Sequence, residues 1–140
     1  MSMIKEILKE ASSLGACGKS GGVSDWKSLV WLFFTPQGRE FCERHNFPSL
    51  EMFRGMKESV AGHGVLVDAG RVVRSDDANI ALIGDTTAEL TYSGVECTHK
   101  VILMHGAKAR IKASGYAVLL IVNVGGCEVE IEKDETVVVL

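Results

Sequence analysis

The chain has 140 residues, 46% of them hydrophobic, and a formal net charge of −3. This size and apolar content suit one compact domain or two small subdomains, and the charge offers no concentrated positive field for non-specific nucleic-acid binding. The apolar runs are too short to cross a bilayer, and the N-terminus, Met1 to Lys9, lacks the apolar core of a signal peptide. We therefore expect a cytoplasmic or virion-associated protein that does not span a membrane.

Residues 1–62 are predicted to form a helical head, a small bundle of four short helices. Apolar residues recur at three- and four-residue steps, and capping residues and prolines mark the helix ends. These signals place the helices at 4–14, 24–33, 35–45 and 49–60. The second helix is apolar nearly all round, so we expect it to be buried together with Trp26 and Trp31.

The short turn between the third and fourth helices raises the hypothesis of a DNA-binding helix-turn-helix. A recognition helix of that kind presents basic and amide side chains on its outer face. Here Arg54 and Lys57 alternate with Glu51 and Glu58, which gives a balanced face. DNA binding by the head is therefore kept as an alternative to a packing or interaction role.

Residues 63–140 are predicted to form a repetitive, β-rich tail. Leu90, Ile111 and Ile131 occupy the same place in three glycine-bounded copies, at steps of 21 and 20 residues. Apolar and polar residues alternate in each copy, which is typical of strands with one buried face. A continuous apolar segment precedes each copy.

These patterns predict an α+β fold in which the helical head is followed by a short β-solenoid of about three coils. Leu90, Ile111 and Ile131 should stack inward, and residues 65–79 should form an irregular first coil that the head caps. Two outward rows of side chains are expected, one of Glu89, Arg110 and Glu128 and one of Thr91, Lys112 and Glu130. The alternative is an antiparallel β-sandwich or jelly roll.

No motif in the chain predicts catalysis, a cofactor or a metal site. Gly18-Lys19-Ser20 ends like a phosphate-binding loop but lacks the required glycine at position 13. Cys42 and His45 have zinc-ligand spacing without a second pair in the head, and no orienting group can be assigned to a nucleophile made of Cys97 with His99 or His105. The four cysteines are expected to be free thiols.

Five segments carry a resemblance to known proteins: Pro48–Arg54, Asp76–Ile80, Val101–Gly106, Tyr116–Val118 and Gly125–Val129. In these segments the chain resembles a group of proteins, encoded in prophages and mobile elements of gut anaerobic bacteria, that has no assigned activity. The resemblance spans roughly residues 40–140 and brings no catalytic or binding residues with it. It implies a setting in which short solenoids serve as assembly or attachment parts.

The leading hypothesis is a non-enzymatic structural or protein-interaction protein that binds a partner or self-associates through its β tail. The alternatives are a DNA-binding accessory protein that uses the head and a carbohydrate-binding module that uses the tail aromatics. We expect no membrane partner. The residues expected to make contacts are Arg54, Lys57, Tyr92, Arg110, Lys112 and Tyr116.

Overall fold

The computed structural model describes residues 7, 9, 25–93 and 98–140. In this part of the chain the head contains α2 (Trp26–Phe33), α3 (Pro36–His45), α4 (Leu50–Val60) and the short 3-10 helix η2 (Ala61–His63). The tail contains β1 (Val65–Val67), β2 (Gly70–Ser75), β3 (Asn79–Ile83), β4 (Thr86–Tyr92), β5 (Thr98–Met104), β6 (Lys108–Ala113), β7 (Val118–Asn123), β8 (Glu128–Lys133) and β9 (Val138–Val139). The helix predicted over 4–14 lies outside the described residues except at Ile7 and Lys9.

The helix starts at Thr35 and Ser49 follow the sequence prediction. The Thr35 side chain accepts a hydrogen bond from the backbone N–H of Gly38, and the Ser49 side chain accepts one from Met52. Each cap satisfies a backbone donor that the helix itself cannot, and such a cap contributes about 1 kcal/mol. None of the helices in the described ranges is long and apolar enough for a membrane span.

The prediction that α2 is buried all round is wrong at one position. Leu29 and Phe33 point into the core, whereas the Trp31 side chain lies on the opposite face of the helix and is 63% exposed. Trp31 therefore lies on a solvent-exposed face of α2, which the apolar composition of this helix does not predict.

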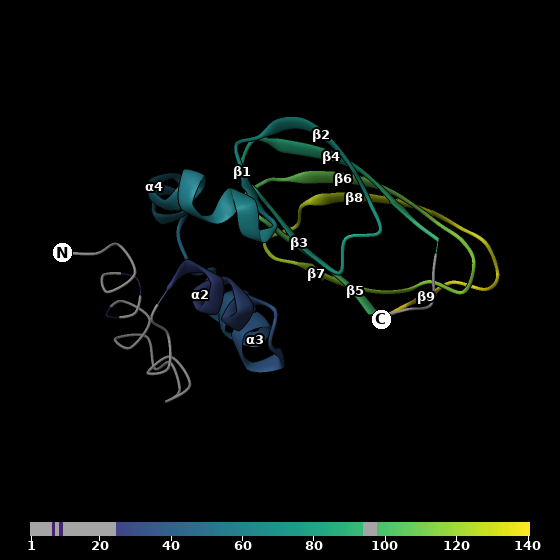
Figure 1. Ribbon diagram of the computed structural model, residues 1–140, viewed down its shortest axis with the longest axis horizontal. Helices are drawn as coiled ribbons and strands as arrows, with labels where there is room; N and C mark the ends of the chain where they lie inside the picture. Colours follow the sequence, from purple (N-terminus) through teal and green to yellow (C-terminus); the bar gives the residue numbers. More distant parts are fainter. Residues whose placement is uncertain (1–6, 8, 10–24, 94–97) are drawn as a thin grey trace.

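The tail is a β-solenoid of about four coils, whose successive strands alternate between two sheets (Figure 1). Sheet A has the order β1-β3-β5-β7-β9, and sheet B has the order β2-β4-β6-β8. Leu90 pairs with Ile111, which pairs with Ile131, so the predicted register of these residues is confirmed. The strand pairs in the described residues are parallel, so the antiparallel sandwich is wrong.

The first coil, which was expected to be irregular over residues 65–79, is regular, and the solenoid has about four coils where about three were predicted. In sheet B, Arg74 pairs with Leu90, and Leu90 pairs with Ile111. The first step is 16 residues and the second is 21, because only three residues separate β2 from β3. Because of the shorter step, a search for a period near twenty could not show that the first coil is regular.

The two outward rows of sheet B also differ from the prediction in their last coil. One row contains Val73, Glu89, Arg110 and Glu130, and the other contains Ser75, Thr91, Lys112 and Glu132. The predicted third members, Glu128 and Glu130, were two positions early. Parallel pairing of Ile111 with Ile131 places Arg110 beside Glu130, so the inner row fixes the outer ones.

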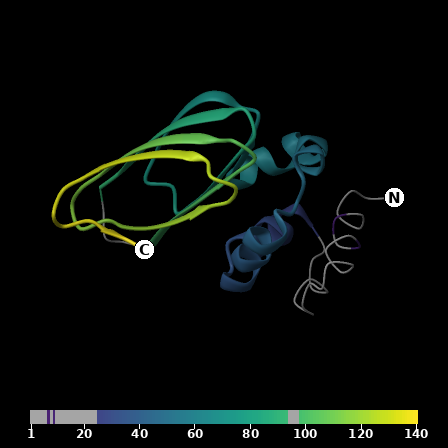
Figure 2. The same ribbon diagram turned by 180° about the vertical axis from the view of Figure 1, so that it is seen from behind.

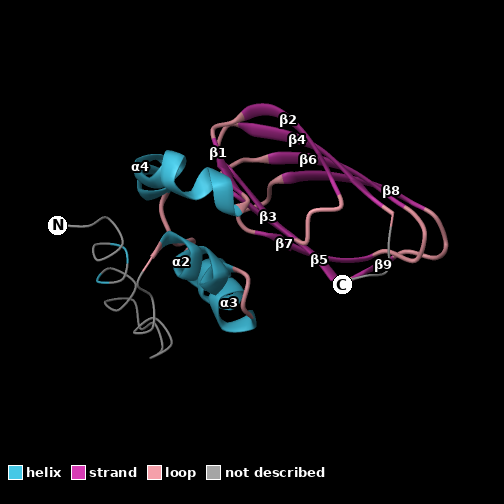
Figure 3. Cartoon of the chain, in the orientation of Figure 1, coloured by secondary structure: helices cyan, strands magenta, loops and turns pink. Residues whose placement is uncertain are grey.

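The described residues form two cores. The inner core fills the solenoid between its sheets and includes Leu90, Leu103 and Ile111. The outer core lies between the helices and sheet A, where Phe53 and Met56 of α4 join residues such as Ile83. Figures 2 and 3 show the helices gathered beside the solenoid, on the side of sheet A.

The head therefore covers the outer face of sheet A across several coils, and α4 and η2 also pack against β1, the first strand of the first coil. This arrangement explains the two kinds of strand in the sequence. Strands such as β3 and β5 contain continuous apolar runs because both of their faces are buried, whereas β4 and β6 alternate because one face meets solvent.

Candidate interaction surface

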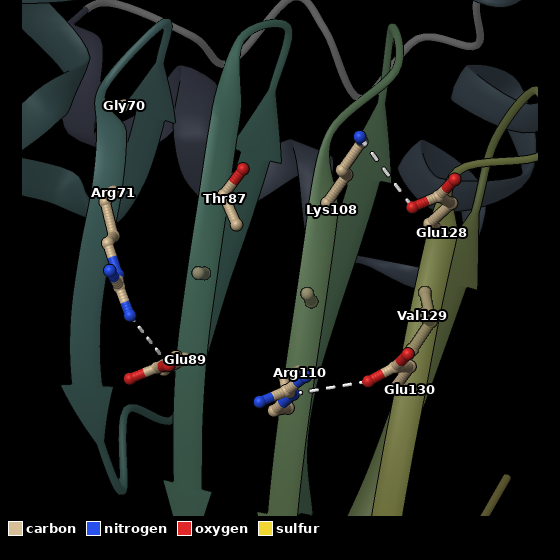
Figure 4. Close-up of a pocket in the computed structure, with 11 residues that line it drawn as sticks. Gly70, Arg71, Thr87, Glu89, Lys108, Arg110, Glu128, Val129 and Glu130 are labelled. Atoms are coloured by element: carbon tan, nitrogen blue, oxygen red, sulfur yellow. Dashed lines mark hydrogen bonds and ion pairs between the residues drawn. The ribbon is translucent and has the colours of Figure 1, made fainter.

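The outer face of sheet B carries a regular array of charges. Its basic strand, β6, presents Lys108, Arg110 and Lys112, and its last strand, β8, presents Glu128, Glu130 and Glu132. The paired N···O distances are 3.8, 3.2 and 4.0 Å. Figure 4 shows the first two of these pairs, with the glutamates turned toward β6. Exposed pairs of this kind contribute little stability each, but they favour this strand register over its neighbours.

A shallow open groove of about 760 Å³ crosses the four strands of sheet B between two of these rows (Figure 4). Its floor includes Ala88 and Ala109, whose side chains point inward, and its walls are the charged rows. Arg71 pairs with Glu89 at 3.4 Å, and Arg110 pairs with Glu130, so the wall charges compensate one another. The groove therefore offers a ligand no unbalanced charge among its described lining residues.

The C-terminal end of the solenoid is chemically unlike its middle. In the inner row, Leu90 is 1% exposed and Ile111 is 0% exposed, but Ile131 is 39% exposed. In the described residues β8 pairs only with β6 and β9 only with β7, so each sheet ends in an unpaired strand edge. Val138, Val139 and Leu140 are exposed beside it. We call β8 and β9 together the open end.

The opposite end of the solenoid is protected. In sheet A, β1 is buried and packs against α4 and η2. In sheet B the inner row that contains Ile131 begins with Arg74, whose Nε lies 3.9 Å from a carboxylate oxygen of Asp77. A charge at an inward position of an edge strand opposes the addition of another strand. At the open end the corresponding position is Ile131, and the inward charge of the edge strand lies two residues later, at Lys133.

The predicted contact residues Arg54 and Lys57 join the head to the tail. The Arg54 Nε donates to Asp68 Oδ2 at 2.6 Å, and the Lys57 Nζ donates to the backbone carbonyl of Asp68 at 3.2 Å. Asp68 Oδ1 also accepts from the backbone N–H of Asp85 at 2.8 Å. The hydrogen bond from Arg54 holds the pKa of Asp68 below its usual value. Both basic side chains thus contact the turn between β1 and β2.

Of the remaining predicted contact residues, three are exposed and one is not. Arg110 and Lys112 lie on the charged face, and Tyr116 is exposed in the turn between β6 and β7. Tyr92 is only 1% exposed, and its ring centroid lies 4.6 Å from that of His99 inside the solenoid. Burial raises the pKa of Tyr92. The expectation that Tyr92 is a surface contact is wrong, because it lies two positions after Leu90 and shares its inward face.

The histidines and cysteines considered for chemistry occupy separate places. Cys42 is buried in the outer core, where desolvation raises the pKa of its thiol to about 12. His99 Nδ1 donates to the Asp77 carbonyl at 3.0 Å, and His105 Nε2 donates to the Pro48 carbonyl at 2.7 Å. Cys17, Cys97 and the Gly18-Lys19-Ser20 segment lie outside the described residues. Within the described ranges, no three His, Cys, Asp or Glu side chains are grouped to hold a metal ion.

Sequence reasoning missed the residues that distinguish the two ends, Arg74 and the exposed Ile131. Arg74 could have been found by aligning the first coil at its shorter step. The exposure of Ile131 has no sequence signal, since its repeat matches those of Leu90 and Ile111. No family model, curated protein or solved structure matches this chain.

Proposed function

We propose that this chain is a non-enzymatic structural or protein-interaction protein whose β tail binds a partner, or a second copy, through the open end. The observation that carries the proposal is the exposure of Ile131, an inner-row residue with two fully buried counterparts. An apolar inner row beside an unpaired strand edge favours the addition of another strand, because both the side chains and the backbone groups gain partners.

The paired charges on the outer face of sheet B also favour the open end as the binding site. The outer face of sheet B is paired along its length, so the described part of that face offers compensated charges. The open end combines exposed apolar side chains with an unpaired backbone edge. The resemblance to prophage and mobile-element proteins adds the proposal that the chain is an assembly or attachment component of such an element, in the cytoplasm or on a virion.

The DNA and carbohydrate alternatives are not carried forward. Arg54 and Lys57 already contact Asp68, and Tyr92 is buried. No observation on the described surface favours either ligand.

The test compares the wild-type chain with Ile131→Asp and with a matched control, Val73→Asp. Both substitutions place a carboxylate at an exposed apolar position of an edge strand of sheet B. We expect Ile131→Asp to abolish self-association in light scattering, or binding of a defined partner, while the control preserves it. A wild-type chain that is monomeric at all concentrations and takes no added strand would overturn the proposal.

A further inference from the structure

We infer that the edge of β8 is an acceptor for one added β-strand, and that the strand it takes alternates lysine or arginine with small or aliphatic residues. The inference rests on the proposed function and names the chemistry of the partner. Its site is the five-residue run Glu128–Glu132, with the glutamates on the outer face and Val129 and Ile131 on the inner one.

The outer face of β8 requires positive charge. Its glutamates already meet one basic strand, β6, and a strand added on the free side would lie at the same spacing of about 4.8 Å. A second basic strand would place each glutamate between two cations. An acidic strand would place like charges directly opposite one another at three positions, which is destabilising.

The inner face requires apolar side chains. Val129 and Ile131 would pack against the inward residues of the added strand. Ala109 and Ile111 pack against their neighbours in the same way within the solenoid. Lys133 occupies the next inward position along β8, so only Val129 and Ile131 are apolar on the inner face of this strand. The best template is therefore β6 itself, which places Ala109 and Ile111 inward and three basic residues outward.

A second copy of this chain fits the β8 edge poorly. Two β8 edges placed together would oppose two rows of three glutamates. The free edge of β2 would place Arg74 over Ile131, and burying that charge against an aliphatic side chain is costly. The charges therefore favour an extended segment of a separate protein.

The experiment titrates the full chain with a capped peptide that copies residues 107–114, and with a counterpart that has glutamate at its three basic positions. We expect the basic peptide to bind at least tenfold more tightly, and raised salt to reduce this difference. Backbone amide shifts should centre on β8. Equal binding of the two peptides, or shifts centred elsewhere, would overturn the inference.

A charge-swapped chain is the decisive variant. Glutamates replace Lys108, Arg110 and Lys112, and lysines replace Glu128, Glu130 and Glu132. The net charge and the pairs of opposite sign between β6 and β8 are kept, and the swap reverses the charge that the edge presents. It also places a glutamate at position 110 beside Glu89, so the fold of the swapped chain is checked by circular dichroism before the titration. The preference should move to the acidic peptide, and a preference that stays with the basic peptide would contradict the inference.

The two proposals fail in different ways. If neither peptide binds but the chain self-associates and Ile131→Asp abolishes this, the basic-strand inference is wrong and the open end remains the interaction site. If Ile131→Asp changes neither peptide binding nor self-association, the proposed function fails as well.

Discussion

Arg74 and Ile131 occupy the two ends of one inner row of sheet B, with Leu90 and Ile111 buried between them. The row therefore begins in a charge that is held beside Asp77 and ends in an exposed aliphatic side chain. The charge of Arg74 opposes strand addition at the first coil, and our proposal places strand addition at the other end, at Ile131.

Removing the charge of Arg74 should allow the edge of the first coil to bind another chain. We expect Arg74→Leu to raise the weight-average mass in sedimentation experiments, because the edge of β2 then presents an aliphatic inner row. Arg71→Leu is the control, since Arg71 lies on the outer face of the same strand. Equal masses for wild-type and Arg74→Leu chains would show that this charge does not protect the edge.

The inner row also predicts a gradient of stability. Ile111→Ala removes a fully buried side chain and should lower the free energy of unfolding by about 2–5 kcal/mol. Ile131→Ala should cost clearly less, because a large part of that side chain already meets water. Urea unfolding of the two variants measures the difference, and equal losses would place Ile131 inside the core.

Parts of this architecture were predictable and parts were not. The 21- and 20-residue steps gave the solenoid and the Leu90–Ile111–Ile131 register, because each coil reuses one pattern of inward residues. The first coil was expected to be irregular because its step is 16 residues, so Arg74 could not be aligned with Leu90. The position of the head was readable in principle, since residues 80–83 and 101–104 lack the alternation of a one-faced strand.

The residues of the interaction surface were harder to predict from the sequence than the fold. Tyr92 was assigned to the surface although the alternation through Leu90 places it inward. Ile131 could not be separated from Ile111, because exposure at the end of a stack depends on which strands are neighbours and not on the repeat itself.

The Tyr92 hydroxyl predicts an asymmetry between two substitutions. This hydroxyl is buried and has no hydrogen-bond partner among the described residues. Tyr92→Phe should therefore leave the free energy of unfolding within about 1 kcal/mol of wild type or raise it, because no hydrogen bond is lost. Tyr92→Ala should lower it by about 3–5 kcal/mol through the cavity that it creates. A large loss in Tyr92→Phe would reveal a hidden partner.

The contact between Arg54 and Asp68 predicts how stability depends on pH. The pKa of Asp68 is lowered, chiefly by the hydrogen bond from Arg54. Its contribution is fully present above the unfolded pKa of about 4 and is lost as the pH falls through the lower folded value. Asp68→Asn should therefore lower stability at pH 7 and lose less stability than wild type on acidification below pH 4.

Glu58→Gln is the control for this experiment, since Glu58 is an exposed carboxylate on the same helix as Arg54. It should follow the wild-type profile. Identical acid profiles for wild type and Asp68→Asn, measured by thermal unfolding from pH 2 to 7, would show that Asp68 does not couple the head to the tail.

Backbone amide exchange along β8 tests most directly whether the open end is a strand acceptor. In the free chain, the β8 amides that point away from β6 should exchange quickly, while their neighbours that bond to β6 are protected. Adding the peptide that copies residues 107–114 should slow exchange at the outward-pointing amides alone. Unchanged exchange along β8 at saturating peptide, or protection centred on another strand, would contradict the account.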